Sequence, residues 1–167
     1  LQLKGNVFEP KPVDLSALAR ETIRLLEPEL EKKKIQLTME LQNLLQVHTD
    51  LNMMRSVLRN LLTNAIKFTD AGGIIRLRSA EVSASEVIFS VADNGTGIPE
   101  ENRDKLFTLG TVSTQGTEAE KGTGLGLMLC REFIEKSGGR IWFESAEGKG
   151  TTFFFTLPIY QRDKLSA

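Results

Sequence analysis

The chain has 167 residues, of which 40% are hydrophobic and 26% are charged, and its formal net charge is −1. A chain of this length suits one domain with a sizeable core, and its near-neutral charge gives no general electrostatic reason to bind nucleic acid or an anionic membrane. Because no apolar run approaches the ~20 residues of a membrane span and no signal peptide opens the chain, we expect a cytoplasmic protein.

The first half of the chain predicts a helix, two strands and a second helix. Residues 1–12 are typical of a linker, so we expect a longer parent protein. Asp14 is a candidate N-cap for a helix whose apolar residues recur at helical spacing up to the charged EKKK segment. IQLTMEL (35–41) alternates like a strand, and LLQVHT (44–49) is a shorter strand candidate. Asp50 would cap the next helix, which DAGG ends.

The second half predicts two strands, a loop, a helix and a closing pair of strands. Two alternating stretches, 74–82 and 85–93, flank a polar turn. The polar stretch 94–121 has only a brief helical hint, and a glycine-led helix follows it as far as EKSGG. RIWFES (140–145) and TTFFFTLPI (151–159) then form a hairpin-like pair. This order predicts helices layered on one face of a mixed sheet, an α/β sandwich.

A polar face of the second predicted helix is the first candidate site. Asn60, Asn64 and Lys67 lie at positions i, i+4 and i+7, so one face carries two amides and an ammonium group. The alternative is a solvated surface, although such surfaces normally use Glu and Lys because asparagine is a mediocre helix former. An amide oxygen suits Mg²⁺, which takes few protein ligands plus phosphate oxygens, and Lys67 would supply charge for the same phosphates.

The segment DNGTGIP is the second candidate site. Asp93 ends an apolar strand, and a carboxylate there can accept a hydrogen bond from an exocyclic amine such as that of adenine. Gly95 and Gly97 would let the chain turn close against a flat ring. The alternative is a plain turn, since Asp-Asn-Gly is common turn chemistry.

The segment GTGLGL is the third candidate site, because Gly122, Gly124 and Gly126 precede an apolar helix. Helix N-termini and bare backbone amides bind anions, so a nearby phosphate would explain the missing side chains. The spacing fits neither the G-x-G-x-x-G dinucleotide fingerprint nor the P-loop. A phosphate site here would therefore belong to another architecture.

The single cysteine and single histidine do not suggest a metal or redox site. Cys130 has no partner for an internal disulfide, which favours a reducing compartment, and its place on the apolar face of a helix predicts a core residue. A structural zinc site would need more ligands of these kinds. His48 has no acid beside it before Asp50, and we expect it to be a partly exposed structural histidine.

Four of these segments, in this order, resemble the ATP-binding catalytic domain of bacterial sensor histidine kinases. That domain belongs to the GHKL superfamily, with DNA gyrase, the heat-shock chaperones and the mismatch-repair ATPases. NLLTNAIKFT matches the family's N box, DNGTGI its G1 box, KLF its F box and GTGLGL its G2 box. EGKGTTFFFTLP resembles the closing glycine turn and last strand, and the resemblance covers about Phe8 to Ile159.

The resemblance implies a fold and domain limits. The fold would be a two-layer sandwich of the Bergerat type, with a mixed sheet covered on one face by about three helices. Residues 13–160 would form the ATP-binding catalytic domain. Residues 1–12 would be a linker remnant from an upstream dimerisation domain, and 161–167 would be a C-terminal tail.

The resemblance also implies roles for single residues, with ATP and Mg²⁺ as ligands. Asn64 would coordinate Mg²⁺, assisted by Asn60, and Lys67 would neutralise phosphate charge, which makes Asn60 and Lys67 the catalytic pair. Asp93 would bind the adenine amine. The other residues implied to bind ATP are Phe68, Gly95, Gly97, Ile98, Phe107, Lys121, Gly122, Thr123, Gly124, Leu125, Gly126, Leu127 and Thr151.

A lid would connect the G1 and G2 boxes. The polar segment from about Ile98 to Lys121 would close over the triphosphate and would be mobile without nucleotide. Phe107 would anchor its beginning against the domain, and Ser113 and Thr114 would be further phosphate contacts.

One position favours histidine phosphorylation over hydrolysis. The ATP-hydrolysing members of the superfamily carry a glutamate four residues before the metal-binding asparagine, where it acts as a general base. This position is Asn60 here, and an amide takes no proton at neutral pH. Neutral histidine is already a nucleophile, so a transferase acting on it needs no such base.

The acceptor histidine is expected on another domain. A complete histidine kinase carries it beside an acid in a two-helix dimerisation domain, often as H-[DE]-x-x-x-P, and this motif is absent here. The resemblance therefore implies transfer to that separate domain, with a response regulator as an indirect partner. We expect the chain to be a monomer, and its parent could be membrane-anchored. The alternatives are a weak ATPase of the same fold and a nucleotide-gated interaction module.

Overall fold

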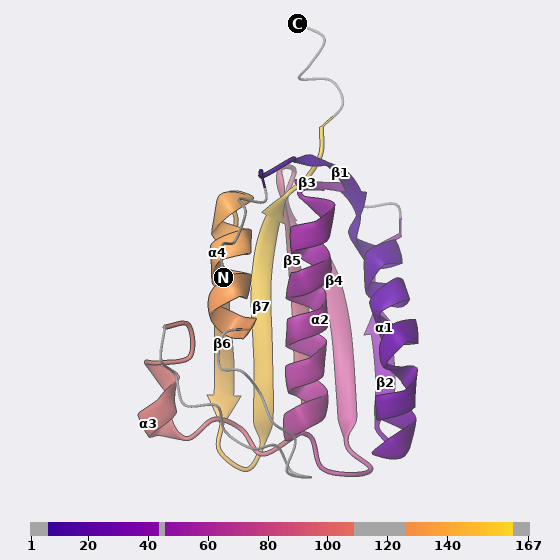
Figure 1. Cartoon of the computed structure of the whole chain (residues 1–167), viewed down its shortest axis with the longest axis vertical. Helices are drawn as coiled ribbons and strands as arrows, with labels where there is room; N and C mark the ends of the chain where they lie inside the picture. Colours follow the sequence, from indigo (N-terminus) through magenta and orange to yellow (C-terminus); the bar gives the residue numbers. More distant parts are fainter. Residues whose placement is uncertain (1–6, 44–45, 109–125, 162–167) are drawn as a thin grey trace, which may run out of the picture.

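The fold is a two-layer sandwich in which three helices lie over one face of a five-stranded sheet (Figure 1). The computed structural model describes residues 7–43, 46–108 and 126–161. The helices of the layer are α1 (Leu15–Lys32), α2 (Leu51–Phe68) and α4 (Gly126–Lys136), and a short α3 (Glu100–Arg103) lies beside it. The strands of the sheet are β2 (Gln36–Glu40), β4 (Ile74–Ser83), β5 (Glu86–Asp93), β6 (Ile141–Ala146) and β7 (Gly150–Pro158).

The sheet is mixed, as the sequence predicts. Its strand order is β2-β4-β5-β7-β6, and β2 is parallel to β4 while the other neighbours are antiparallel. The parallel pair is possible because α2 lies between β2 and β4 in the chain and returns it to the same end of the sheet. Among the described residues, no helix has the length and apolar character needed to cross a bilayer.

Both predicted N-caps are confirmed. The Asp14 carboxylate accepts a hydrogen bond of 2.9 Å from the amide of Ala17, and that of Asp50 accepts one of 3.0 Å from the amide of Met53. Each bond satisfies one of the amides that lack a partner in the first turn of a helix. The two acids therefore fix where α1 and α2 begin.

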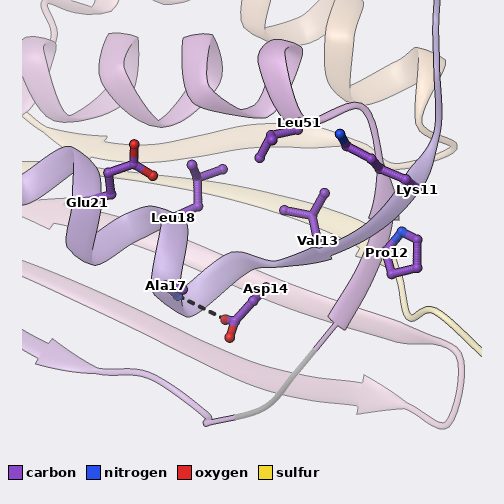
Figure 2. A pocket seen from close by; sticks show the side chains of 8 residues that line it. All are labelled: Lys11, Pro12, Val13, Asp14, Ala17, Leu18, Glu21 and Leu51. Atoms are coloured by element: carbon purple, nitrogen blue, oxygen red, sulfur yellow. Dashed lines mark hydrogen bonds between the residues drawn. The ribbon is translucent and has the colours of Figure 1, made fainter.

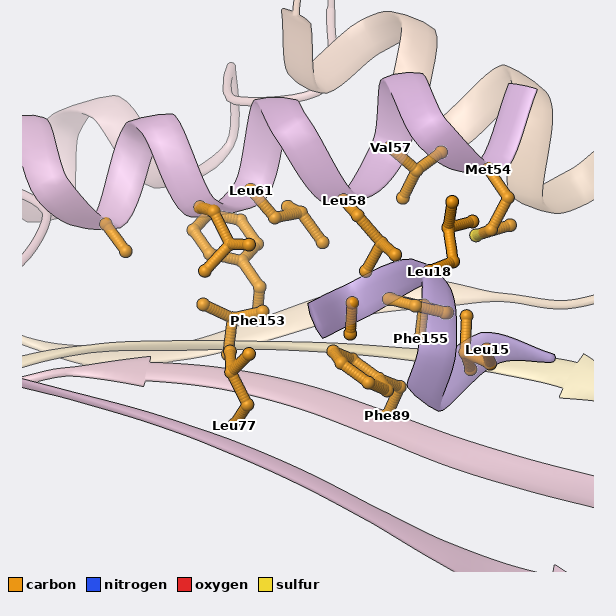
Figure 3. Close-up of a cluster of buried hydrophobic side chains, with 14 of the residues drawn as sticks. Leu15, Leu18, Met54, Val57, Leu58, Leu61, Leu77, Phe89, Phe153 and Phe155 are labelled. Carbon is orange, nitrogen blue, oxygen red and sulfur yellow. The ribbon is translucent and has the colours of Figure 1, made fainter. Parts of the chain in front are cut away.

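The core lies between α2 and the centre of the sheet (Figure 3). Met54, Leu58 and Leu61 recur on one face of α2 and are fully buried. They face the strands that carry Phe89 and Phe155, whose rings stack with centroids 5.2 Å apart. Burial of each side chain of this size contributes about 1.5–3 kcal/mol, so this layer holds α2 firmly on the sheet.

A second, two-stranded sheet was not expected from the sequence. β1 (Lys11–Asp14) pairs antiparallel with β3 (Gln46–Thr49), so that Lys11 lies opposite Thr49. The strand begins inside the stretch predicted as a linker, 1–12. A four-residue strand that contains Pro12 has too few alternating positions to show a pattern, and its partner is more than thirty residues away.

Candidate functional site

Asp93, at the end of β5, presents a half-buried carboxyl group at one end of the sandwich. Its Oδ1 accepts hydrogen bonds from the amides of Gly95 at 2.9 Å and Thr151 at 3.3 Å. Within the described parts of the chain, no hydrogen bond reaches Oδ2, so this oxygen is open to a ligand. Burial raises the pKa of Asp93 to about 6, against the lowering effect of the two amides. A carboxylate oriented in this way can accept a hydrogen bond from an amine.

Two glycines bring the loop after β5 against its neighbours. A Cβ on Gly95 would lie 2.0 Å from the carbonyl oxygen of Phe68. Gly97 has a φ of +72°, and a Cβ there would lie 2.3 Å from the carbonyl oxygen of Ala146. Between them, the amide of Thr96 donates to the Phe68 carbonyl at 3.0 Å. Only glycine fits both positions, so the predicted close turn is present and packs against protein backbone.

Ser145 links the start of β7 to the same loop. Its hydroxyl accepts a hydrogen bond of 2.9 Å from the amide of Ile98 and lies 2.9 Å from the hydroxyl of Thr151. Ser145 is not predicted from the sequence, because nothing near it in the chain distinguishes it from any other strand residue. Neither is the role of Asn94, whose Oδ1 accepts from the amide of Ile74 at 2.8 Å and ties the loop to β4.

The three polar residues predicted on the second helix lie along α2. Asn60 and Asn64 are half-buried, and Lys67 is only 8% exposed. The Lys67 ammonium lies 4.9 Å from the centroid of the Phe68 ring. No hydrogen bond to the Asn64 amide occurs among the described residues, so its oxygen is available to a cation.

The first turn of α4 lies against Asn60. A Cβ on Gly126 would lie 2.9 Å from Oδ1 of Asn60, so a side chain there would displace the amide. Burial raises the pKa of Cys130 to about 12, although a hydrogen bond with Asn60 lowers it. The thiol therefore stays protonated and is fully buried, which confirms its predicted place in the core.

Phe107 packs against the sheet, as the sequence predicts. Its ring centroid lies 6.0 Å from that of Phe143 and 6.3 Å from that of Phe153, the latter edge-on. Ile98 and Leu127 are also partly buried against the core. The remaining predicted phosphate-side residues lie outside the described residues: Ser113, Thr114, Lys121, Gly122, Thr123, Gly124 and Leu125.

A shallow hollow of about 220 Å³ at the far end of the sandwich contains none of these residues (Figure 2). It lies between β1, the first turns of α1 and the start of α2. Its floor is apolar, with Val13, Leu18 and Leu51, and the exposed Lys11 and Glu21 flank it. The candidate functional site is therefore the end formed by Asp93, its loop and α2.

Known proteins match both the sequence and the fold. Residues 49–161 match the family described as histidine kinase-, DNA gyrase B-, and HSP90-like ATPase. The "Adaptive-response sensory kinase SasA" of Synechococcus sp. (strain JA-2-3B'a(2-13)) is 40% identical over 148 residues, which are 88% of this chain and 39% of that protein. The chain thus spans about two fifths of the length of this relative.

Solved structures of histidine kinases have the same fold. The nucleotide-free catalytic domain of histidine kinase ThkA has a TM-score of 0.78 and 37% identity, covering 90% of this chain and 95% of that one. ThkA in complex with the response regulator protein TrrA has a TM-score of 0.75 and 34% identity, covering 94% and 44%.

Full-length ShkA in complex with AMPPNP has a TM-score of 0.76 and 29% identity, covering 92% of this chain and 32% of that one. These likenesses agree with the order of sequence boxes and with the two-layer sandwich. The chain belongs to the histidine kinase-, DNA gyrase B- and HSP90-like ATPase family, as a histidine kinase catalytic domain.

Proposed function

We propose that this chain binds ATP and transfers its γ-phosphate to a histidine on a separate dimerisation domain of the same parent kinase. The observation that carries the proposal is Asp93, whose Oδ1 is held by two backbone amides while Oδ2 stays open at the end of β5. Membership of the family and the AMPPNP complex of ShkA support a nucleotide as the ligand.

The adenine would bind beside Asp93. Oδ2 would accept a hydrogen bond from the exocyclic amine. The close turn at Gly95 and Gly97, which packs against the backbone carbonyls of Phe68 and Ala146, would hold the loop in place beside the ring. Thr151 and Ile98 would act through the hydrogen bonds that orient the carboxylate and the loop. A hydrogen bond from the amine would also lower the pKa of Asp93 and so offset part of the increase that burial causes.

The phosphates would extend from there along α2 toward the first turn of α4. Lys67 would supply positive charge for the phosphates. Asn60 lies beside Gly126, the first residue of α4. Asn64 fits Mg²⁺ because its amide is half-buried and has no hydrogen bond from described residues. When bound, Mg²⁺ would neutralise negative charge on the triphosphate. The glycines at 122 and 124 would let backbone amides approach the phosphates.

The transfer step needs no base from this chain. A ring nitrogen of the neutral acceptor imidazole would attack the γ-phosphorus, forming an N–P bond. The bond between the γ-phosphorus and the bridging oxygen would break, ADP would leave, and the imidazole proton would pass to solvent. Asn60, in the place of the glutamate that activates water in related ATPases, agrees with this chemistry.

The partners would come from the rest of a two-component system. The dimerisation domain would carry the acceptor histidine, and a response regulator would then receive the phosphate. The complex of histidine kinase ThkA with the response regulator protein TrrA supports a response regulator as a partner. We propose that the chain itself is a monomer, which light scattering would test.

A phosphotransfer assay tests the proposal. The chain, Mg²⁺ and γ-labelled ATP would be mixed with the separately produced dimerisation domain of the parent. We expect acid-labile label on that domain, loss of the label with Asp93→Ala, and full transfer with Glu81→Gln, which removes an exposed acid on β4. Release of free phosphate without label would indicate an ATPase, and nucleotide binding without either product would indicate an interaction module.

A further inference from the structure

Lys33, the C-cap of α1, is a buried lysine that no step of the proposed reaction uses. Lys33 is only 3% exposed, so its side chain is buried together with its backbone. The ammonium donates hydrogen bonds to the carbonyl oxygens of Ile66 at 2.7 Å and Lys67 at 3.1 Å. Both acceptors belong to the last turn of α2, which carries the phosphate-side residue Lys67 and the loop contact Phe68.

The last four carbonyl groups of an α-helix have no partner inside the helix. In α2 these are the carbonyls of residues 65–68, and groups from outside the helical ladder satisfy all of them. The hydroxyl of Thr69 donates to Ala65, and the amide of Thr96 donates to Phe68. The ammonium of Lys33 donates to Ile66 and Lys67, and Ile66 also accepts a longer bond of 3.4 Å from the amide of Thr69. Lys33 therefore serves two of the four, and its positive charge suits the negative end of the helix dipole.

The backbone of Lys33 is itself held in place. The amide of Lys34 donates to the carbonyl of Glu31 at 3.0 Å, and that of Ile35 donates to Leu30 at 2.9 Å, which is the bond pattern of a Schellman motif. The carbonyl of Lys33 also accepts from the amide of Gly72 at 2.8 Å, in the turn that follows α2. The end of α1 is thus tied to the end of α2 by both main chain and side chain.

We infer that Lys33 is a positioning residue for the nucleotide site, acting through the last turn of α2. By bonding the carbonyls of Ile66 and Lys67, it holds Phe68 where the amide of Thr96 can reach its carbonyl. That bond in turn sets the loop that begins at Asp93. The inference rests on the proposed function, because it assigns Lys33 to the affinity of the same site.

The test compares Lys33→Met, which keeps the apolar stem and removes the donors, with Lys32→Met. The control removes the same charge from the neighbouring, exposed lysine of α1. Two readouts are taken well below the melting temperature: the Kd for a non-hydrolysable ATP analogue with Mg²⁺, and hydrogen exchange of the Thr96 amide without nucleotide. We expect Lys33→Met to raise the Kd at least about tenfold, a change of ~1.4 kcal/mol in binding free energy. We also expect it to speed hydrogen exchange at the Thr96 amide more than at the Phe155 amide in the core.

A purely structural lysine would lower the melting temperature and leave both readouts equal to those of Lys32→Met, and that result would overturn the inference. If Lys33→Met does not fold, Lys33→Gln replaces it, since the shorter neutral side chain cannot reach both carbonyls; equality with the wild type in both readouts would again overturn it. Failure of the wild type to bind nucleotide would contradict the proposed function, while Thr96 exchange would still decide the role of Lys33.

Discussion

The amide of Thr96 donates a hydrogen bond of 3.0 Å to the carbonyl oxygen of Phe68, the last residue of α2. This bond joins the loop after β5 to the helix that carries Asn60, Asn64 and Lys67. The acid predicted to bind adenine and the residues predicted to face the phosphates are therefore held as one unit.

The close approach at Gly95 predicts a large loss of stability on adding a methyl group. A Cβ there would lie 2.0 Å from the Phe68 carbonyl oxygen, so Gly95→Ala must push the loop away from α2. We expect the free energy of unfolding, measured by urea denaturation, to fall by about 3 kcal/mol. Gly148→Ala is the control, because φ there is +77° but a Cβ would have no neighbouring atom within 4 Å. Its free energy of unfolding should fall by only about 1 kcal/mol. Equal losses in the two variants would contradict the clash.

The pKa of Asp93 predicts how binding depends on pH. It is raised from 3.8 to about 6 by burial, so below pH 6 the carboxyl group is increasingly protonated and a poorer acceptor for an amine. Between pH 7.5 and 5, the affinity for an ATP analogue should fall about tenfold more in the wild type than in Asp93→Asn. The phosphates of the ATP analogue titrate in the same way with both proteins, so the comparison cancels their effect. Parallel pH profiles of the two proteins would rule out this role for the ionised carboxylate.

The same pKa predicts the direction of a stability change. Between pH 3.8 and 6 the folded protein keeps the Asp93 proton that the unfolded chain has released. This group alone therefore lowers the free energy of unfolding as the pH rises through that window. The free energy of unfolding of the wild type minus that of Asp93→Asn, measured by urea titration, should fall from pH 4 to pH 6. A rising difference would mean that the amides of Gly95 and Thr151 outweigh burial.

Lys34 predicts a stabilising substitution. It follows the C-cap of α1 with a φ of +53°, a left-handed conformation that residues with a Cβ adopt at a penalty. Lys34→Gly should raise the free energy of unfolding by about 1 kcal/mol, since glycine is the usual residue at this position of a Schellman motif. Lys32→Gly, inside the helix, should lower it by about 1 kcal/mol. A lower stability for Lys34→Gly would contradict the assignment of strain.

His48 should not be an acceptor of phosphate. It is exposed on β3, with its ring centroid 6.0 Å from that of Tyr160, as expected for a partly exposed structural histidine. β3 lies at the end of the sandwich away from the C-terminus of α2 (Figure 1). Incubation of the chain alone with γ-labelled ATP and Mg²⁺ should therefore yield no acid-labile label. Label that His48→Gln removes would refute the prediction of an acceptor elsewhere.

Local patterns predicted most of the fold. The N-caps Asp14 and Asp50 were predicted from single residues before apolar helical stripes, and both make the expected bond. The strand predicted at 140–145 is observed at Ile141–Ala146, because alternation marks a half-buried strand to within about a residue. The pairing of β1 with β3 was missed because short strands that meet far apart in sequence leave no local pattern.

The site was predicted only in part, for a physical reason. Asp93 and its glycines are marked in sequence because a close turn restricts the residue types that fit. Ser145 and Lys33 act through hydrogen bonds to distant backbone, which any serine or lysine could make, so their roles become visible only in three dimensions. The phosphate-side glycines at 122 and 124 lie outside the described residues, and their role stays a prediction.

Calorimetric titration of the intact chain with a non-hydrolysable ATP analogue and Mg²⁺, alongside Asp93→Ala and Glu81→Gln, tests the central claim most directly. We predict micromolar binding by the wild type and by Glu81→Gln, and no measurable binding by Asp93→Ala, because the variant lacks the only acceptor proposed for the adenine amine. Equal binding by wild type and Asp93→Ala, or no binding by the wild type, would contradict the proposal that this end of the sandwich is an ATP site.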